Sequence, residues 1–342
     1  MESSRPILDD PLTANEHLTL EMVMFLLTTQ HSKGKANELL RQYCLQSPIA
    51  DVQKKGMEFL YMNGYTDDLQ KLIHKNKTSN DRSKQEWSEV YQFMLDRDQQ
   101  HTYPLKTVMH RLNAIRTSEP ELQCLLKFAH ISISMDSGDY ECVGHLLQQQ
   151  HELVEKISDR MLMNFFKTRL YTSLFMYYWR RNELIIARKF AFRALNQSTN
   201  SRTKIALHVN LGLTYLFDTY EQGMYHMREA LKLARTYKHY DLEAIINEQN
   251  IPFLAAEFGI SDQIQTQDKS EQAHLAMANG HYDKAERILS SVPINTPFRL
   301  YYLGVVTQNR QLLLQSYSHF IEKNSDYFFS RLPLRAMQKI HD

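Results

Sequence analysis

The chain of 342 residues has few residues that break helices, since it contains only ten glycines and nine prolines. Average composition would supply roughly twice as many of each. A fold of short strands joined by many tight turns depends on these two residue types. Their scarcity excludes that architecture and favours long helices.

Cysteine, net charge and long apolar runs are also scarce. Cys44, Cys124 and Cys142 are too few and too scattered for a disulfide framework or a thiolate metal cage. With 40 basic and 39 acidic residues the formal net charge is +1, so no global field attracts nucleic acid or an anionic membrane. No stretch reaches the ~18 apolar residues that cross a bilayer, and residues 1–10 lack the apolar core of a secretory signal. We therefore expect a cytoplasmic protein.

Catalytic and metal-binding signatures are missing as well. The sequence has no HExxH, GxSxG or CxxC motif and no glycine-rich phosphate loop. Its 15 histidines are dispersed. The nearest pairs, His101 with His110 and His145 with His151, lack the spacing of about three or four residues that places two rings on one helical face. We expect no cofactor, no metal and no enzymatic activity.

Helical periodicity is what the sequence does contain. Residues 17–29 carry apolar side chains so densely that both faces of this helix are predicted to be buried. Residues 75–84 (KNKTSNDRSK) have no apolar period and are predicted to form a hinge or an exposed connector. We expect a disordered or extended N-terminus over residues 1–16, N-terminal helical repeats over 17–100, and central and C-terminal repeats over 101–342.

A recurring local phrase indicates the fold class. A short polar loop is followed by an aromatic or aliphatic residue and an amphipathic helix in five segments, 137–149, 181–195, 218–234, 279–292 and 309–323. Their mean interval is near the ~34–47 residues of helical-hairpin repeats. Hairpins that cannot bury their apolar faces alone stack into a superhelix with a concave surface. The pattern favours an all-α, degenerate tetratricopeptide-like superhelix (an α-solenoid) over an irregular helical bundle.

One aromatic and basic cluster raises the question of nucleic-acid binding. Trp179, Arg180, Arg181 and Arg188 mix cations with an aromatic ring, as surfaces that stack bases do. The apolar residues between them also satisfy a packing face. The pattern therefore favours a packed helix with solvated cations.

Peptide binding fits the predicted concave surface better. It requires a cation for a terminal carboxylate and acids for a basic side chain. Arg202, at the head of the 202–217 helix, is a candidate cation, and Glu271 and Asp326, each at a helix start, are candidate acids. Spacing alone leaves open that all three are capping or solvated charges, because acids are favoured in first turns anyway.

Several segments resemble one known family. The segment YYLGVVTQNRQLLLQSYSHFIEKNSDYFFSRLPLRAMQKI (301–340) resembles the closing repeat of the arbitrium peptide receptors, the AimR family of Bacillus phages. ALNQSTNSRTKIALHVNLG (194–212) resembles the family's central repeat, and QYCLQS (42–47), SKQEWSEVY (83–91) and EQAH (271–274) match it as well. The resemblance implies a helical-repeat receptor in the host bacterial cytoplasm. Such a receptor binds a short phage peptide and thereby switches a transcriptional regulator of the lysis–lysogeny decision.

The resemblance also implies roles for individual residues. Arg202 would clamp the carboxylate of the peptide, while Glu271 and Asp326 would face its basic residue and backbone, with Phe328 packing beside them. Where the family uses asparagines to hold the peptide backbone, this chain has Met176, Arg180 and Leu213. We therefore expect either a peptide of different sequence or none.

Two parts of the family pattern have no counterpart in the sequence. They are the N-terminal helix-turn-helix and the C-terminal dimerisation helix. A helix-turn-helix protein normally binds DNA as a dimer. This departure argues against direct DNA binding and predicts a monomer or weak dimer. The alternative function is a peptide-independent adaptor or decoy that contacts a host or phage protein.

Overall fold

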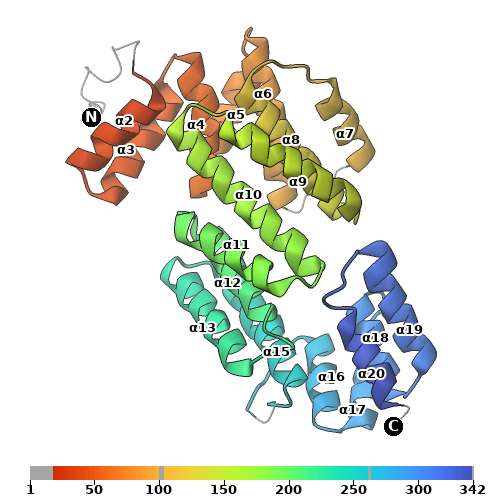
Figure 1. The fold of residues 1–342 in the computed structure, drawn as a ribbon. Coiled ribbons are helices and arrows are strands. Elements are labelled where there is room, and N and C mark those ends of the chain that lie inside the picture. The colour runs from red at the N-terminus through yellow and green to blue at the C-terminus, as the bar shows by residue number, and fades with distance from the viewer. Residues whose placement is uncertain (1–17, 100–103, 261–262, 341–342) are drawn as a thin grey trace. The chain divides into compact units, whose positions relative to one another are not determined.

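The computed structural model describes residues 18–99, 104–260 and 263–340 (Figure 1). Every regular element within these ranges is helical, as the scarcity of glycine and proline predicts. The chain divides into two compact units: unit 1 comprises residues 1–134 and 145–170, and unit 2 comprises residues 135–144 and 171–342. The N-terminus that we predict to be disordered or extended, residues 1–16, lies outside the described residues.

Unit 1 is a succession of helices that pack on their sequence neighbours, with α2 on α3, α4 on α5 and α5 on α6. Its core includes the fully buried Leu40, Trp87, Tyr91 and Phe166. The helices are α2 (Leu20–Gln30), α3 (Lys33–Gln46), α4 (Ala50–Asn63), α5 (Thr66–Lys77), α6 (Arg82–Asp98), α7 (Leu105–Ala114), α8 (Pro120–Asp136), α9 (Tyr140–Glu155) and α10 (Arg160–Arg180), of which α8 ends, α9 begins and α10 continues in unit 2.

Helix α2 buries only one of its faces. Leu20, Val23 and Leu27 are buried, because α3 and α4 pack against that side. Phe25, in contrast, is 68% exposed. The prediction that both faces of this segment are buried is therefore wrong for the described part of the chain.

Residues 75–84, which we predict to form a hinge or an exposed connector, are mostly helical. Helix α5 continues to Lys77 and α6 begins at Arg82, so only four residues connect them. Asn76 is fully buried, and the Asp81 carboxylate caps α6 by accepting from the Lys84 N–H at 3.3 Å. Most of the polar side chains of this segment lie at the exposed ends of two helices that pack on each other. Because the segment contains the end of one helix and the start of the next, no single apolar period runs through it.

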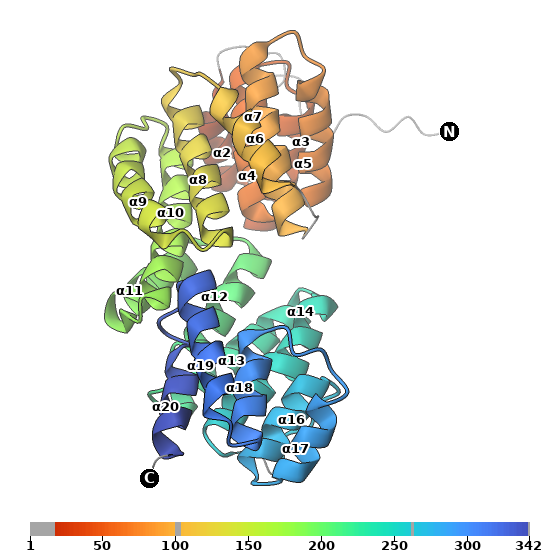
Figure 2. The same ribbon diagram turned by 90° about the vertical axis from the view of Figure 1, so that its right-hand side faces the viewer.

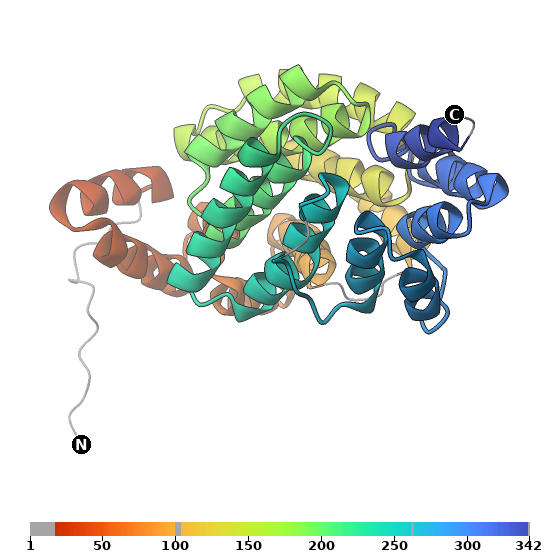
Figure 3. The ribbon, with the colours of Figure 1, turned by 90° about the horizontal axis from the view of Figure 1, so that it is seen from below.

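Unit 2 consists of helical hairpins that follow one another, α12 with α13, α16 with α17 and α18 with α19 (Figure 3). Beyond the second half of α10, its elements are α11 (Leu184–Gln197), α12 (Ser201–Leu213), α13 (Tyr220–Thr236), α14 (Tyr240–Ile245), the π-helix η1 (Ile246–Asn250), α15 (Ile251–Glu257), α16 (Lys269–Ala278), α17 (Tyr282–Leu289), α18 (Pro297–Val306), α19 (Arg310–Ser318), the π-helix η2 (His319–Lys323) and α20 (Arg331–Lys339).

The recurring phrases mark where these hairpins turn. Each of the five contains a loop and the start of a helix, namely α9, α11, α13, α17 and α19. In the first, second and fourth phrases the loop contains a residue with positive φ, Gly138 (74°), Asn182 (63°) and Gly280 (75°), and Gln308 (50°) immediately precedes the fifth. The left-handed conformation ends one helix and redirects the chain into the next.

Residues 324–331, which we call the closing segment, return to the end of α10 within unit 2 (Figure 2). The Tyr327 N–H donates to the Arg180 carbonyl at 2.8 Å, and the Arg331 guanidinium donates to the Asn182 side chain at 3.1 Å. The Ser325 hydroxyl donates to the Gly138 carbonyl at 2.9 Å. Three segments that are distant in sequence therefore meet at one place in unit 2.

Gly138 tests how tightly this place is packed. A Cβ atom at Gly138 would clash with the Lys323 carbonyl oxygen, whereas one at Gly280, whose φ is nearly the same, would meet nothing within 4 Å. Both alanine variants carry the cost of the left-handed conformation, about 1 kcal/mol. We expect Gly138→Ala to lower the unfolding free energy of unit 2 by about 1–2 kcal/mol more than Gly280→Ala, measured by urea unfolding. Equal losses would contradict the close approach.

Candidate functional site

A cavity of about 380 Å³ opens in unit 2 between the ends of several helices. Its walls come from η1, from the first turns of α16 and α18, from Leu213 at the end of α12, and from Phe329 of the closing segment. The π-helix contributes Gln249 and Asn250. Such π-helical turns within α-helices occur frequently at functional sites.

Helix caps place the charged residues at this cavity. The Asp268 carboxylate begins α16 by accepting from the Glu271 N–H at 3.1 Å. The Thr296 hydroxyl begins α18 by accepting from the Arg299 N–H at 3.2 Å, and Pro297 occupies the first position, where a missing N–H costs nothing. Glu271 and Arg299 therefore both lie in first turns.

Arg299 is a cation that is held only by neutral groups among the described residues. Its Nε donates to the Ser270 hydroxyl at 2.7 Å. Its Nη1 donates to the Pro293 carbonyl at 3.0 Å and to the Asn295 side-chain oxygen at 3.2 Å. The helix dipole disfavours a cation in a first turn. The charge of Arg299 is thus held in place without being neutralised, and an anion is the group it would attract.

Glu271 belongs to a buried chain of ionisable groups. Its carboxylate accepts from the Tyr302 hydroxyl at 3.2 Å and lies 3.3 Å from His274 Nδ1. The other ring nitrogen, Nε2, is 3.0 Å from the Glu257 carboxylate. Burial opposes protonation of the ring, but the hydrogen bonds and charges of the two carboxylates outweigh it and raise the pKa of His274 to about 9. An imidazolium therefore bridges Glu257 and Glu271 at neutral pH.

Aromatic rings supply the apolar part of the cavity. Phe253, Phe298 and Phe329 line it, and the ring of Phe298 contacts the other two edge-on, with centroids 5.5 and 5.1 Å away. The Asp326 carboxylate holds the backbone of Phe329 by accepting its N–H at 2.9 Å. The cavity thus combines a cation, two carboxylates and an aromatic wall.

The structure brings some of the predicted site residues together here. Glu271 and Leu213 line the cavity. Asp326 and Arg180 form an ion pair of 2.9 Å just behind Phe329, with the Asp326 side chain only 4% exposed. Burial raises the pKa of Asp326, and the Arg180 charge opposes that rise.

Phe328 and Met176 belong to the hydrophobic core of unit 2 and do not line the cavity. Phe328 is fully buried against Trp179 and Phe217. Met176 packs against that core and receives the Asn210 amide on its sulfur at 3.7 Å.

Arg202 is not part of this group. It lies in the first turn of α12, whereas Leu213 ends that helix, roughly 16 Å further along the axis at 1.5 Å per residue. Its side chain is 51% exposed and pairs with Asp241, whose pKa the Arg202 hydrogen bond lowers. The expected convergence of Arg202 with Glu271 on one cavity is absent from the described structure.

The sequence reasoning missed Arg299 and Asp268. One signal was available, because the Thr296–Pro297 pair predicts a helix start and places Arg299 in its first turn. A cation there is unfavourable for the helix and so indicates another role. The position of Asp268 as the cap of α16 became visible only with the helix bounds.

Comparison with known proteins agrees with the fold. The sequence profile described as AimR transcriptional regulator-like matches residues 36–339. The chain belongs to this AimR-like family. The resemblance drawn from the sequence is thereby confirmed. AimR proteins are transcriptional regulators, in agreement with the expectation that the chain is not an enzyme.

Individual AimR relatives are distant in sequence. The AimR transcriptional regulator of Bacillus phage SPbeta and the SPbeta prophage-derived uncharacterized protein YopK of Bacillus subtilis (strain 168) are each 21% identical over 314 residues, which cover 89% of this chain and 80% of each relative. The AimR transcriptional regulator of Bacillus phage phi3T is 22% identical over 323 residues, or 89% of this chain and 82% of the relative.

Solved AimR structures match the chain in fold. The structure described as phAimR-Ligand matches with a TM-score of 0.78 at 18% identity and covers 95% of this chain and 98% of that one. The structure of SeMet-phAimR matches with a TM-score of 0.70 at 17% identity, over 95% and 86% of the two chains. The prediction of an all-α helical-repeat superhelix is confirmed. In the described part of the chain no helix is long and apolar enough to span a membrane.

Proposed function

We propose that this AimR-like chain is a receptor of the arbitrium type, which binds a short communication peptide in the bacterial cytoplasm and so regulates the lysis–lysogeny decision of a phage or prophage. The observation that carries this proposal is the cavity of unit 2. There Arg299, without a carboxylate partner among the described residues, lines the same cavity as Glu271, Asp268 and the aromatic wall. Membership of a family of transcriptional regulators supports it.

The chemistry of the cavity suits one end of a short peptide. Arg299 offers a guanidinium to a terminal carboxylate, the pairing with the most favourable geometry for a fork of N–H donors. Asp268 and Glu271 offer carboxylate oxygens to a basic side chain. The volume of about 380 Å³ holds a few residues, and the rest of the peptide would extend outside the cavity.

The contacts in unit 2 lead us to assign roles that differ from those implied by the family resemblance. Arg202 already has Asp241 as its partner on the surface, so we propose that Arg299 receives the peptide carboxylate. Asp326 already has Arg180, so we propose that its role is to hold Phe329 in the wall of the cavity. The basic group of the peptide then goes to Glu271 and Asp268.

Titration calorimetry with the mature peptide encoded beside the gene tests this assignment. Arg299→Ala should weaken binding by about 1.5–3 kcal/mol, because the hydrogen bond that it removes joins two charged groups. Arg202→Ala should cost at most about 1 kcal/mol, as is usual for an exposed ion pair. Arg235→Ala is the matched control, since Arg235 is also exposed and paired, with Glu243.

Two results would count against the proposal. If the wild-type chain does not bind the peptide, the receptor function is wrong. If Arg202→Ala abolishes binding while Arg299→Ala leaves it unchanged, the carboxylate binds at Arg202, as the family resemblance implies, and not in this cavity.

A further inference from the structure

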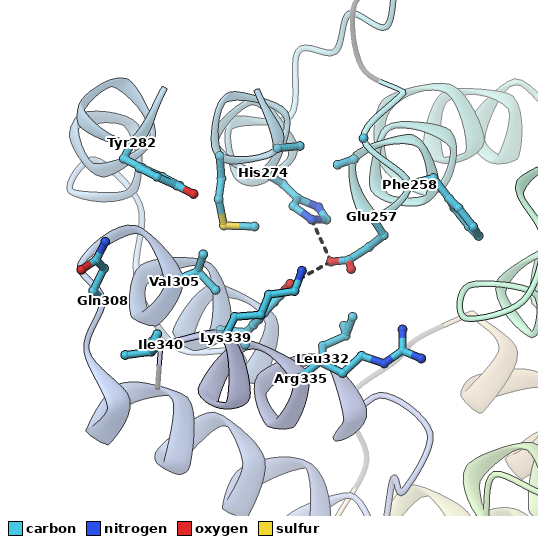
Figure 4. Close-up of a pocket in the computed structure, with 16 residues that line it drawn as sticks. Glu257, Phe258, His274, Tyr282, Val305, Gln308, Leu332, Arg335, Lys339 and Ile340 are labelled. Carbon is cyan, nitrogen blue, oxygen red and sulfur yellow. Dashed lines mark hydrogen bonds and ion pairs between the residues drawn. The ribbon is translucent and has the colours of Figure 1, made fainter. Parts of the chain in front are cut away.

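Unit 2 contains a second, larger cavity of about 660 Å³ (Figure 4). Its lining comes from the end of α15 and from α16, α18 and α20. His274 separates it from the first cavity, because its partner Glu257 lines the second cavity and its partner Glu271 lines the first. The two cavities are therefore different sites that share one buried histidine.

The Glu257 carboxylate lines this cavity, and one of its two oxygens has no hydrogen-bond partner among the described residues. Its Oε1 accepts from His274 Nε2 at 3.0 Å and from the Tyr301 hydroxyl at 3.2 Å. Its Oε2 has no hydrogen-bond partner within the described ranges, although the side chain is only 13% exposed (Figure 4). A cationic group in the cavity would find a free acceptor at Oε2.

Helix α20 contributes two cations to the lining of this cavity. Arg335 and Lys339 are four residues apart on this helix and both are exposed (Figure 4). Neither has a carboxylate partner among the residues that the structure describes, and Glu257 is the single acid among the lining residues. Like charges at this spacing destabilise a helix, so an anion bound between them is favourable.

Much of the remaining lining is apolar. Met277, Val305 and Ile340 form an aliphatic surface, and Tyr282 adds an aromatic ring. A guest with a short aliphatic side chain would cover this surface. A ligand with only a positive charge would pair with Glu257 alone, and a ligand with only a negative charge would pair with the two cations alone.

We propose that this cavity binds a small zwitterion, either a free α-amino acid or a dipeptide with an aliphatic side chain. The ammonium group contacts Glu257 Oε2 and the carboxylate contacts Lys339 and Arg335. This site does not depend on the peptide-receptor function proposed for the first cavity, because none of these three residues lines that cavity.

Calorimetry of the full chain with L-leucine and with Leu-Leu tests the proposal, and the tighter of the two identifies the source of the zwitterion. N-acetyl-leucine, which lacks the ammonium group, should bind at least about tenfold more weakly than leucine, because the Glu257 contact is shielded from water. Leucinamide, which lacks the carboxylate, should bind about two- to fivefold more weakly, because the cations are exposed. These comparisons use the wild-type chain and do not depend on the folding of a variant.

Variants then locate the binding. Glu257→Gln should weaken leucine binding at least about tenfold, and the double variant Arg335→Ala/Lys339→Ala should weaken it about two- to fivefold. Lys284→Ala, which removes an exposed cation on α17, is the control and should change nothing. The proposal is overturned if neither ligand binds at concentrations up to ~10 mM. It is also overturned if both analogues bind as tightly as leucine, or if the control variant weakens binding as much as the double variant.

Discussion

Replacing Arg169 with methionine is expected to lower the free energy of unfolding of unit 1 by about 3–5 kcal/mol. Arg169 on α10 donates from Nε to the Glu58 carboxylate on α4 at 2.8 Å, and Tyr91 on α6 donates to the same carboxylate at 2.6 Å. Glu58 is completely buried. Without the guanidinium, a buried carboxylate would keep a single neutral partner, and the cost of leaving such a charge unpaired exceeds that of most substitutions.

The surroundings of Arg169 make this pair central to unit 1. The guanidinium also lies 4.3 Å from the ring centroid of Tyr61. Burial opposes its charge, yet the Glu58 carboxylate outweighs burial and raises the pKa of Arg169. The side chain therefore stays charged at any pH at which the protein is folded, and it joins three helices of one unit.

A set of variants separates the contribution of the Glu58–Arg169 ion pair from the contribution of side-chain packing. Since a buried ion pair is often replaceable by apolar residues of similar size, the triple variant Glu58→Met/Tyr91→Phe/Arg169→Met should recover most of the loss. The chain has two tryptophans, Trp87 in unit 1 and Trp179 in unit 2. In a Trp179→Phe background, Trp87 fluorescence during urea unfolding reports unit 1 alone. A loss below about 1 kcal/mol for Arg169→Met would contradict the importance of the pair.

The stability of unit 2 is expected to fall by about 3 kcal/mol as the pH rises from 6.5 through 9, because His274 loses its proton. The pKa of His274 is raised from 6.5 to about 9 in the folded chain. A group whose pKa is higher in the folded state binds its proton more tightly there. Its contribution is therefore complete below pH 6.5 and disappears as the pH passes about 9.

The measurement needs a matched variant, because Tyr301 and Tyr302, both buried in unit 2, also have raised pKa values and weaken the fold at high pH. His274→Gln retains both tyrosines and removes only the imidazolium. In a Trp87→Phe background, Trp179 fluorescence follows the urea unfolding of unit 2 at each pH. The difference between wild type and variant should shrink across this range, and a constant difference would show that His274 is not protonated.

A second histidine acts in the opposite direction and defines the lower end of the useful pH range. Burial, with the charges of His208 and Arg188, lowers the pKa of His226 to about 4. Its neutral form is the one that fits the fold, so acid between pH 6.5 and 4 destabilises unit 2. Measurements above pH 6.5 therefore avoid the titration of His226.

The sequence was a good guide to whatever depends on neighbouring residues. The recurring phrases located the hairpin turns because a left-handed residue such as Gly138 or Asn182 ends one helix and begins the next within a few positions. Family membership and the all-helical class followed from long segments of pattern. Local pattern failed at α2, where Phe25 has the spacing of a buried residue but is covered by no helix of the described ranges.

Charged residues of the site could not be assigned from local pattern, because their partners are distant in sequence. Arg202 and Arg299 look alike as cations in first turns, and only the fold shows that Asp241 pairs with the first while neutral groups hold the second. Asp326 was predicted to face a bound peptide, but its carboxylate forms an ion pair with Arg180. Which charge remains unpaired is a property of the assembled unit.

The closing segment has a consequence for biosynthesis. Arg180 leaves the ribosome long before Asp326 is made, since every residue from Arg181 to Ser325 is added in between. Individual hairpins such as α12–α13 can form during translation, because their two helices emerge together. The contacts of the closing segment with Gly138, Arg180 and Asn182 cannot form until that segment has been made. Nascent unit 2 would therefore remain an open array of hairpins until late in synthesis, with the aromatic residues around Trp179 exposed to chaperones.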